Sequence, residues 1–336
     1  LEIEPEALAA ASLAQVHRAR VVSTGESVVL KGQYPDLVAL LDEDFNTVVK
    51  MLRLARWIPG SRDFDTWLAT LYAQLLAEVD YSRELRMAQM MADGLARHAA
   101  LQGAPVTLRV PHFWPELCGP AVLTMEYVEG HGAASTEVAA LPQTTRDELG
   151  KAMLRLFFAE VFDLGLVQTD PNFGNYLIND DGSELTLLDF GSVFELGQTV
   201  RTALYDSIVA GLTNDEARLE HALVVLGYLK PGAGESAKAT FKAFIKKLLE
   251  PLHPPESLPP EHLNAEGLYC WGHSELINRT GQQVAHSLTN SEFEIPSGDF
   301  AMVARKLTGV FTFIAVLNAK FNGYDIVKPY LTQTTR

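Results

Sequence analysis

The first strand-like pattern in the chain lies within residues 12–34. Residues 12–34 (SLAQVHRARVVSTGESVVLKGQY) contain two Val-rich segments separated by Thr24-Gly25. Valine favours strands, and a Gly-containing pair bounded by such segments is typical of a turn. We therefore predict two strands around a turn.

The spacing of the apolar residues then becomes helical. Residues 36–57 carry an apolar stripe at i, i+3 and i+4 positions, formed by Leu37, Leu40, Leu41, Phe45, Val48, Val49 and Leu52. A second long helix is predicted over about residues 64–97, a segment that contains no proline.

Short strand-like segments return within residues 105–128, as VTLRV and AVLTMEYV. A further helix is predicted over about residues 143–164, where apolar residues recur at helical spacing. Residues 166–191 then read as a loop, a strand (YLIN), a turn at Asp181-Gly182 and a strand (LTLLDF). From residue 197 onward the pattern is helical, with breaks at KPGAGE (230–235) and HPPESLPPEH (253–262).

This order of elements predicts an α+β fold with two lobes. The first lobe, residues 1–130, is rich in strands and contains inserted helices. The second lobe, residues 131–336, is mainly helical, and we place the boundary just after Val128-Glu129-Gly130. A chain of 336 residues is long enough for one large domain or two lobes.

The charge of the chain changes which partners are expected. A net charge of −15 and a pI near 5.0 argue against nucleic acid, because phosphate binding needs a basic surface. Two cysteines, Cys118 and Cys270, cannot form a disulfide framework, so we expect a reducing compartment. The chain opens LEIEPEALAA without a methionine, and we expect further residues upstream.

One apolar run, LTGVFTFIAVL at 307–317, lies between Lys306 and Lys320. It is too short to span a bilayer, so we predict a buried helix and no transmembrane helix in the chain. The aromatic residues Phe311, Phe313 and Phe321 are interpreted as helical core rather than as a ligand pocket.

The stretch QTDPNFGN followed by LLDFG carries the chemistry. Phosphoryl transfer needs an acceptor for the proton of the nucleophile and oxygen ligands for Mg²⁺. Asp170 and Asn175 lie five residues apart, and Asp189 ends an apolar strand, which matches the spacing of the catalytic residues of protein kinases. Each residue alone is equally well explained as the cap of a turn, but the joint spacing favours a metal and phosphate site.

Lys31 lies at the end of the strand VVLK, where kinases place the lysine that binds phosphates. Such a lysine needs an acidic partner on a helix, and both Glu78 and Glu84 in LLAEVDYSREL are candidates. Together with Asp80, these acids are also compatible with a solvated helix face. Residues 9–15 (AAASLAQ) contain no glycine, although glycine lets phosphate approach the backbone closely. Alone, this alanine-rich stretch is equally typical of the start of a helix.

The ordered set AAASLAQVH, VVLKGQYP, EVDYSRE, MEYVEG, QTDPNFGN and LLDFG resembles the UbiB family. These atypical protein-kinase-like proteins, also called aarF-domain or ADCK kinases, are linked to coenzyme Q (ubiquinone) biosynthesis. The resemblance runs from about Ala9 to at least Phe194, and the helical C-terminal part is consistent with it but poor in motifs. It implies an atypical protein-kinase-like bilobal fold with a helical insert in the N-lobe and a mainly helical C-lobe.

The resemblance also implies roles for single residues. Lys31 would bind phosphate, with Glu84 as its partner on the helix, and Asp170 would be the catalytic aspartate. Asn175 and Asp189 would be the Mg²⁺ ligands. The residues implied at the nucleotide are the alanine-rich loop Ala9, Ala10, Ala11 and Ser12, the hinge from Glu126 to Val128, and Met125 behind that hinge. Glu78 and Asp80 would form an acidic pair specific to the family.

The chain departs from the family pattern in two places. The family's K-x-G-Q motif lies in an N-terminal extension and does not occur here, because LKGQ at 30–33 belongs to the Lys31 strand. We expect truncation to explain this. Phe173-Gly174 stands where close relatives carry tryptophan, a change that we expect the loop to tolerate.

The implied activity is that of a kinase or ATPase that uses Mg²⁺ with ATP or ADP and supports ubiquinone biosynthesis. The implied partners are ubiquinone-biosynthesis proteins and lipid-like quinone precursors at a membrane surface. The implied location is the bacterial cytoplasm with peripheral membrane association, or the matrix side of the mitochondrial inner membrane. Two alternatives stay open, namely a nucleotide-gated pseudokinase or lipid-binding regulator without phosphoryl transfer, and a small-molecule kinase of the aminoglycoside or choline type.

Overall fold

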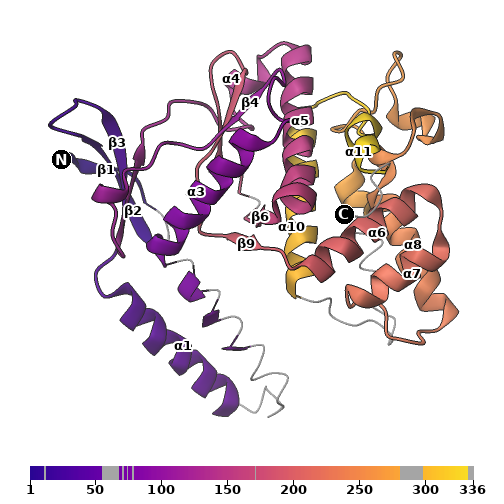
Figure 1. The fold of residues 1–336 in the computed structure, drawn as a ribbon, viewed down its shortest axis with the longest axis horizontal. Helices are drawn as coiled ribbons and strands as arrows, with labels where there is room; N and C mark the ends of the chain where they lie inside the picture. The colour runs from indigo at the N-terminus through magenta and orange to yellow at the C-terminus, as the bar shows by residue number, and fades with distance from the viewer. Residues whose placement is uncertain are drawn as a thin grey trace. The chain divides into compact units, whose positions relative to one another are not determined.

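The computed structural model describes residues 1–10, 13–54, 68–69, 72–73, 75–77, 79–170, 172–280 and 298–331. The chain separates into two compact units, each made of discontinuous segments (Figure 1). Unit 1 comprises Leu1–Ala92, Val110–Val128 and Leu188–Val193, and unit 2 comprises Asp93–Arg109, Glu129–Leu187 and Phe194–Arg336. The predicted lobes were continuous segments, whereas here residues 93–109 belong to the helical unit and residues 188–193 to the unit with the larger sheet.

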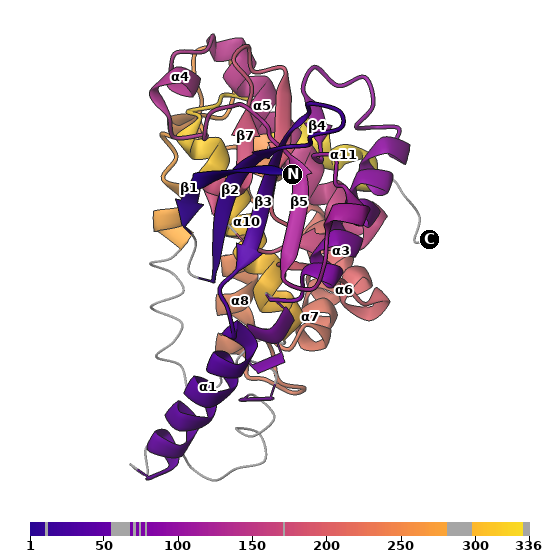
Figure 2. The same cartoon turned by 90° about the vertical axis from the view of Figure 1, so that its left-hand side faces the viewer.

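Unit 1 is built on a four-stranded sheet with the order β1-β2-β3-β5 (Figure 2). Its strands are β1 (Glu2–Ala10), β2 (Ala14–Arg20), β3 (Ser27–Gln33) and β5 (Val122–Glu126), and neighbouring strands are antiparallel. The two predicted strands around Thr24-Gly25 are confirmed, and Gly25 has a φ of +77°, a conformation that glycine adopts without strain.

Strand β1 differs from the sequence prediction, which placed no strand before residue 12. Every residue of β1 is exposed, so its sequence lacks the buried alternation from which strands are recognised. Ala9 and Ala10 pair with Val16 and Gln15 of β2. They are therefore strand residues, and neither a loop nor the start of a helix.

One buried cluster of unit 1 lies on one side of its central strands. Val28 and Leu30 of β3 pack with Ala19 of β2, and Val21 and Trp114 cover them. Positions two apart on a strand face the same side of a sheet, which explains why Val28 and Leu30 share this core. Burying side chains of this size contributes about 2 kcal/mol each, which holds β3 in a fixed place in the sheet.

The helices of unit 1 confirm one prediction and correct another. Helix α1 (Leu37–Leu54) forms within the predicted range 36–57. The predicted single helix over 64–97 is wrong, because the chain leaves the helical path at Val79-Asp80 before α3 begins (Tyr81–Arg97). The Asp80 side chain accepts a hydrogen bond at 3.0 Å from the backbone N–H of Arg83. Asp80 is therefore the N-cap of α3, a position that favours aspartate.

Asp80→Ala tests this cap. We expect the free energy of unfolding to fall by about 1 kcal/mol, because the substitution leaves a backbone N–H of the first turn without its acceptor. Denaturant unfolding followed by circular dichroism measures the change. Asp93→Ala, at an exposed position inside the same helix, is the matched control and should change the free energy of unfolding very little. Equal losses in both variants would show that Asp80 does not act as a cap.

Unit 2 contains two small sheets. Strand β8 (Glu184–Leu187) pairs parallel to β4 (Thr107–Arg109) and antiparallel to β7 (Tyr176–Ile178). The predicted turn at Asp181-Gly182 is confirmed, with a φ of +73° at Gly182. Strands β6 (Leu166–Gln168) and β9 (Val193–Glu195) form the second sheet. The sequence had indicated a loop where β6 lies, since a three-residue strand is too short to show a period.

Helices make up the rest of unit 2. The predicted helix over 143–164 is confirmed as α5 (Gln143–Phe158), which continues as a π-helix (Ala159–Leu164) and ends at Gly165. The further helices are α4 (Thr136–Ala139), α6 (Gln198–Thr213), α7 (Glu216–Val225), α8 (Glu235–Leu248), α10 (Gly298–Val316) and α11 (Tyr324–Leu331). The proline-rich break at 253–262 contains two short 3₁₀ turns, Pro255–Ser257 and Pro260–His262, and two more are Glu250–Leu252 and, in unit 1, Pro115–Leu117.

The core of unit 2 includes the apolar run that was predicted to be a buried helix. It lies in α10, where Phe311 and Phe313 are buried, and Phe321 beyond the helix stacks on Trp271 with ring centroids 5.1 Å apart. Their interpretation as core residues is confirmed. Among the described residues, no helix combines the length and the apolar character needed to cross a membrane.

Candidate functional site

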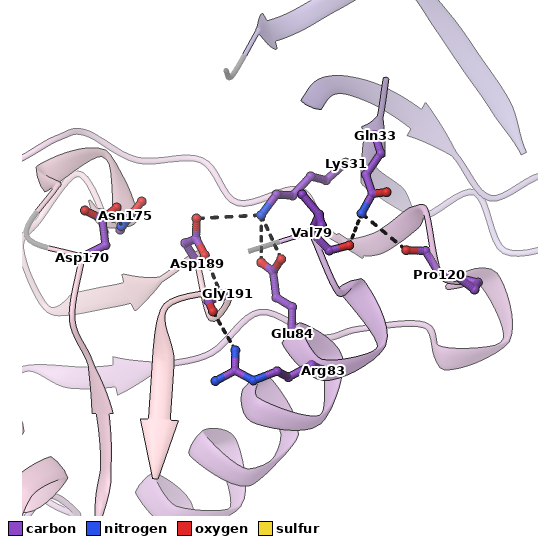
Figure 3. A network of polar contacts seen from close by, with 10 residues as sticks. All are labelled: Lys31, Gln33, Val79, Arg83, Glu84, Pro120, Asp170, Asn175, Asp189 and Gly191. Atoms are coloured by element: carbon purple, nitrogen blue, oxygen red, sulfur yellow. Dashed lines mark hydrogen bonds and ion pairs between the residues drawn. The ribbon is translucent and has the colours of Figure 1, made fainter. Parts of the chain in front are cut away.

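Strand β3 and helix α3 bring a lysine and a glutamate together inside unit 1 (Figure 3). Lys31 Nζ donates to Glu84 Oε1 at 2.9 Å and to Glu84 Oε2 at 3.0 Å. The Glu84 side chain is 1% exposed and that of Lys31 17%. Of the two candidate partners of Lys31, the structure therefore pairs it with Glu84, while Glu78 lies outside the described residues.

Asp189 completes this cluster. Its Oδ2 lies 3.8 Å from Lys31 Nζ, and its Oδ1 accepts a hydrogen bond at 2.9 Å from the backbone N–H of Gly191. The side chain is 35% exposed, in contrast to Glu84. Lys31 thus lies beside one buried carboxylate, which holds it, and one accessible carboxylate, which can contact a ligand (Figure 3).

The charges in the cluster shift one another's pKa. Burial alone would lower the pKa of Lys31, but the carboxylates of Glu84 and Asp189 outweigh it, and the net pKa is raised. Burial raises the pKa of Glu84, and Lys31 opposes that rise. Burial also raises the pKa of Tyr81, whose ring lies 5.2 Å from Lys31 Nζ, to about 12. Lys31 therefore stays protonated, and the excess of carboxylate over ammonium suits an added cation.

Arg83 fixes the segment that carries Asp189. Its guanidinium donates to the backbone carbonyls of Gly191 at 2.8 Å and Val193 at 2.5 Å. Since Arg83 precedes Glu84 on α3, one turn of this helix holds both Lys31 and the chain that follows Asp189 (Figure 3). Sequence reasoning missed Arg83, because an arginine in the first turn of a helix reads as a surface residue.

Unit 2 contributes a second cluster around Asp170. Asn175 Nδ2 donates to Asp170 Oδ2 at 2.7 Å, and the backbone N–H of Asn172 lies 3.4 Å from Asp170 Oδ1. Arg305 of α10 places Nη2 3.4 Å from the same oxygen. The five-residue spacing therefore brings the two side chains into contact. Because Asn175 uses its amino group here, its amide oxygen is the atom suited to a cation.

A buried lysine of α10 holds both ends of this loop. Lys306 Nζ lies 3.4 Å from Oε1 of Gln168, two residues before Asp170, and 3.1 Å from the hydroxyl of Tyr176, directly after Asn175. The Tyr176 hydroxyl also donates to Gln168 Oε1 at 2.8 Å. These contacts fix the positions at which the chain enters and leaves the Asp170–Asn175 loop.

The partner of Lys306 is Glu160 of the π-helix. Its Oε2 lies 2.9 Å from Lys306 Nζ, with side-chain exposures of 0% for Glu160 and 2% for Lys306. Burial raises the pKa of Glu160, and the ammonium of Lys306 opposes that rise. In the sequence, Lys306 only marks the start of an apolar run. The ion pair could have been predicted because the helical spacing places Lys306 among buried residues. A buried lysine requires an acidic partner.

The remaining predicted site residues have the following positions. Glu126 ends β5 and accepts a hydrogen bond at 3.2 Å from the backbone N–H of His112. Met125 is buried in the same strand, and Val128 follows it. Asp80 caps α3, as described above. Ala11 and Ser12 lie outside the described residues, and a nucleotide-binding role for these positions stays a prediction.

The donor set fits Mg²⁺ held together with phosphate. Within the part of the chain that the structure describes, no three His, Cys, Asp or Glu residues are grouped as metal ligands. Mg²⁺, however, usually takes one or two protein carboxylates and completes its coordination with phosphate and water. In unit 1, Asp189 offers a carboxylate of the kind that this ion prefers. In unit 2, the amide oxygen of Asn175 is a hard ligand of the same kind.

The fold of the chain has a counterpart among solved structures. The protein in "The complex structure of Rv3197-erythromycin from Mycobacterium tuberculosis" superimposes with a TM-score of 0.67, covering 97% of this chain and 76% of that one, at 21% identity. At this identity the likeness shows the fold alone. Residues 1–223 match the ABC1 atypical kinase-like domain. The chain therefore belongs to this family of atypical kinase-like proteins, the UbiB family that its motifs resemble, and the predicted α+β kinase-like fold is confirmed.

Curated relatives agree with this assignment. "Atypical kinase COQ8, mitochondrial" of Schizosaccharomyces pombe is 28% identical over 319 residues, covering 95% of this chain and 49% of the relative. The protein of the same name from Saccharomyces cerevisiae is 31% identical over 247 residues, covering 73% of this chain and 47% of the relative. "Atypical kinase COQ8B, mitochondrial" of Danio rerio is 28% identical over 320 residues, covering 95% of this chain and 48% of the relative. The chain thus spans about half the length of these relatives.

Proposed function

We propose that the protein is an atypical kinase or ATPase that binds ATP or ADP with Mg²⁺ and supports ubiquinone biosynthesis. The observation that carries this proposal is the cluster of Lys31, Glu84 and Asp189 in unit 1. A lysine held by a buried helix glutamate, beside an accessible aspartate that follows a strand, is the arrangement with which kinases bind phosphate and metal. In this proposal unit 1 acts as the N-lobe and unit 2 as the C-lobe.

Each residue of the proposed site has one task. Lys31 neutralises charge on the nucleotide phosphates, and Glu84 keeps its ammonium in place. Asp189 and Asn175 hold Mg²⁺, which when bound supplies charge neutralisation at the phosphates. Asp170 accepts the proton of the attacking hydroxyl or water. We assign the adenine to the backbone of Glu126 to Val128 and the phosphates to that of residues 9–12, as the resemblance implies.

The biological assignment rests on relatives. COQ8 proteins of two yeasts are named as mitochondrial atypical kinases, and a relative from Arabidopsis thaliana is named as chloroplastic. We propose that this chain, like the family to which it belongs, acts with ubiquinone-biosynthesis proteins or on lipid-like quinone precursors at a membrane surface.

Phosphate release from ATP tests the reaction. Asp170→Asn removes the proposed proton acceptor, and since the Asp170 side chain is 31% exposed the fold should tolerate the change. We expect release to fall about a hundredfold or more while Mg²⁺-nucleotide binding persists. Asp180→Asn, at a 95% exposed position in the same unit, is the control. Measuring release with and without lipid vesicles and a phenolic quinone-like compound identifies the activating partner.

One observation favours a second candidate, a nucleotide-gated protein without phosphoryl transfer. No glycine occurs before Gly25, and β1 runs as a paired strand to Ala10, so alanine stands where kinases use glycine to let phosphates approach the backbone. This candidate predicts nucleotide binding with no phosphate release in any of the conditions above. Release that depends on Asp170 would exclude it.

A further inference from the structure

Unit 2 contains a large cavity away from the Asp170 loop. It has a volume of about 1010 Å³, at the upper end of the range for small-molecule sites. Its wall comes from the last turn of α3 and from α5, the π-helix, α6 and α11, together with residues 320–322. Neither Asp170 nor Asn175 is among the lining residues, so the proposed nucleotide chemistry does not account for it.

The cavity wall is cationic in a chain that is strongly acidic overall. Five lysine and arginine side chains line it against three aspartates, namely Arg97, Lys151, Arg155, Arg201 and Lys320 against Asp147, Asp163 and Asp325. The net charge of the whole chain is −15. A local excess of positive charge in a concave wall concentrates anions there.

Two of the three aspartates are already used to hold the wall together. Asp163 Oδ2 lies 2.8 Å from His98 Nε2 and accepts the hydroxyl hydrogen bond of Tyr330 at 2.7 Å. Asp147 Oδ1 accepts from the backbone N–H of Lys320 at 2.7 Å. These carboxylates join the turn after α3, the π-helix, α11 and the start of residues 320–322. Lys151 is itself paired with Glu148, with 2.6 Å between Nζ and Oε1, so the positive charge open to an anion comes from the other cations of the wall.

The arginines retain donor capacity. Arg155 Nη1 lies 3.9 Å from Glu148 Oε2, beyond hydrogen-bonding distance, and Arg201 uses Nη2 to bond the carbonyl of Phe162 at 2.6 Å. Within the described residues, Arg155 Nη1 and Arg201 Nε are buried and have no hydrogen-bond acceptor. Buried donor nitrogens without an acceptor are costly, and an anion near these two atoms relieves that cost.

The rest of the wall is aromatic. Phe162 lies edge-on to Tyr205, with ring centroids 5.9 Å apart, and tilted against Tyr330 at 5.7 Å. Burial, followed by the nearby carboxylate of Asp163, raises the pKa of Tyr330, so this ring stays neutral. The cavity therefore combines a cationic part with an uncharged aromatic part.

We propose that this cavity is a second ligand site, which binds a phosphate monoester carried on an aromatic or apolar group. The arginines suit phosphate because the guanidinium group donates two parallel hydrogen bonds to its oxygens. The aromatic wall of Phe162, Tyr205 and Tyr330 receives the apolar group. The proposal stands independently of nucleotide binding, since it uses none of the residues assigned to the nucleotide.

Calorimetric titration with phenyl phosphate and with inorganic phosphate tests the proposal. We expect wild-type protein to bind one phenyl phosphate per chain, at least tenfold more tightly than inorganic phosphate. The paired variant Arg155→Gln with Arg201→Gln should weaken phenyl phosphate binding at least tenfold. Because Arg201 also bonds Phe162, a second variant, Arg97→Gln with Lys320→Gln, removes cations without breaking a described hydrogen bond and should weaken binding as well.

Two further variants separate this site from the nucleotide site. Arg20→Gln, an exposed position in unit 1, should leave phenyl phosphate binding unchanged, and so should Asp189→Asn. The proposal is overturned if the wild type does not bind phenyl phosphate, if the two ligands bind equally, or if both cavity variants bind like wild type. Loss of binding in Asp189→Asn would place phenyl phosphate at the nucleotide site and would equally overturn it.

Discussion

Lys306→Met is expected to lower the free energy of unfolding by about 3–5 kcal/mol, because it leaves the carboxylate of Glu160 buried without its partner. The Glu160 side chain is fully buried, and its Oε2 lies 2.9 Å from Lys306 Nζ. Methionine has a similar length to lysine, so the loss comes from charge and hydrogen bonding rather than from a cavity. Since domains are stable by only about 5–15 kcal/mol, the variant should unfold at markedly lower denaturant concentration.

Two companion variants isolate the ion pair. Lys306→Met combined with Glu160→Gln removes both charges and should recover most of the lost stability, as paired removal of a buried ion pair often does. Lys328→Met, at an exposed position on α11, is the matched control and should unfold like wild type. If the double variant is no more stable than Lys306→Met alone, the carboxylate of Glu160 is not the source of the loss.

Asp189→Asn is expected to abolish Mg²⁺-dependent nucleotide binding. Asparagine keeps the shape of the side chain and can still accept the hydrogen bond of the Gly191 N–H, so the fold should persist. What it removes is the negative charge that the proposal assigns to Mg²⁺. A ligand at one hundred times its Kd stabilises a protein by about 2.7 kcal/mol, and the corresponding rise in melting temperature should disappear in the variant.

The control for this substitution is Asp93→Asn, at an exposed position on α3. It should show the same rise in melting temperature with Mg²⁺ and nucleotide as the wild type. An undiminished rise in Asp189→Asn would show that Asp189 does not hold the ion. A lower melting temperature of Asp189→Asn without ligand would instead point to a structural role beside Lys31.

The residues of the candidate site could be predicted from the sequence where several motifs point to the same role. Lys31 ends an apolar strand, and Glu84 lies far along the chain in a segment with helical periodicity. The pair could be proposed only because kinases combine a strand lysine with a helix glutamate. The sequence left Glu78 and Glu84 as alternatives. The tertiary pairing of β3 with α3 brings Glu84 to Lys31 at 2.9 Å, and no local pattern encodes that contact.

Other features escaped prediction for identifiable physical reasons. Strand β1 is exposed throughout and shows no buried period. At the break at Val79-Asp80, the Asp80 side chain accepts a hydrogen bond from the backbone N–H of Arg83, which competes with continuous helix in a proline-free segment. Lys306 and Glu160 are 146 residues apart, so their pairing depends on how α10 packs in unit 2.

Calorimetric titration of the wild-type protein with ATP and with ADP, in Mg²⁺ and in EDTA, tests directly whether the chain binds nucleotide together with Mg²⁺. We expect saturable, Mg²⁺-dependent binding of one nucleotide per chain, because the phosphates and the ion share the site of Lys31 and Asp189. Binding of equal strength in EDTA, or no binding of either nucleotide, would contradict it.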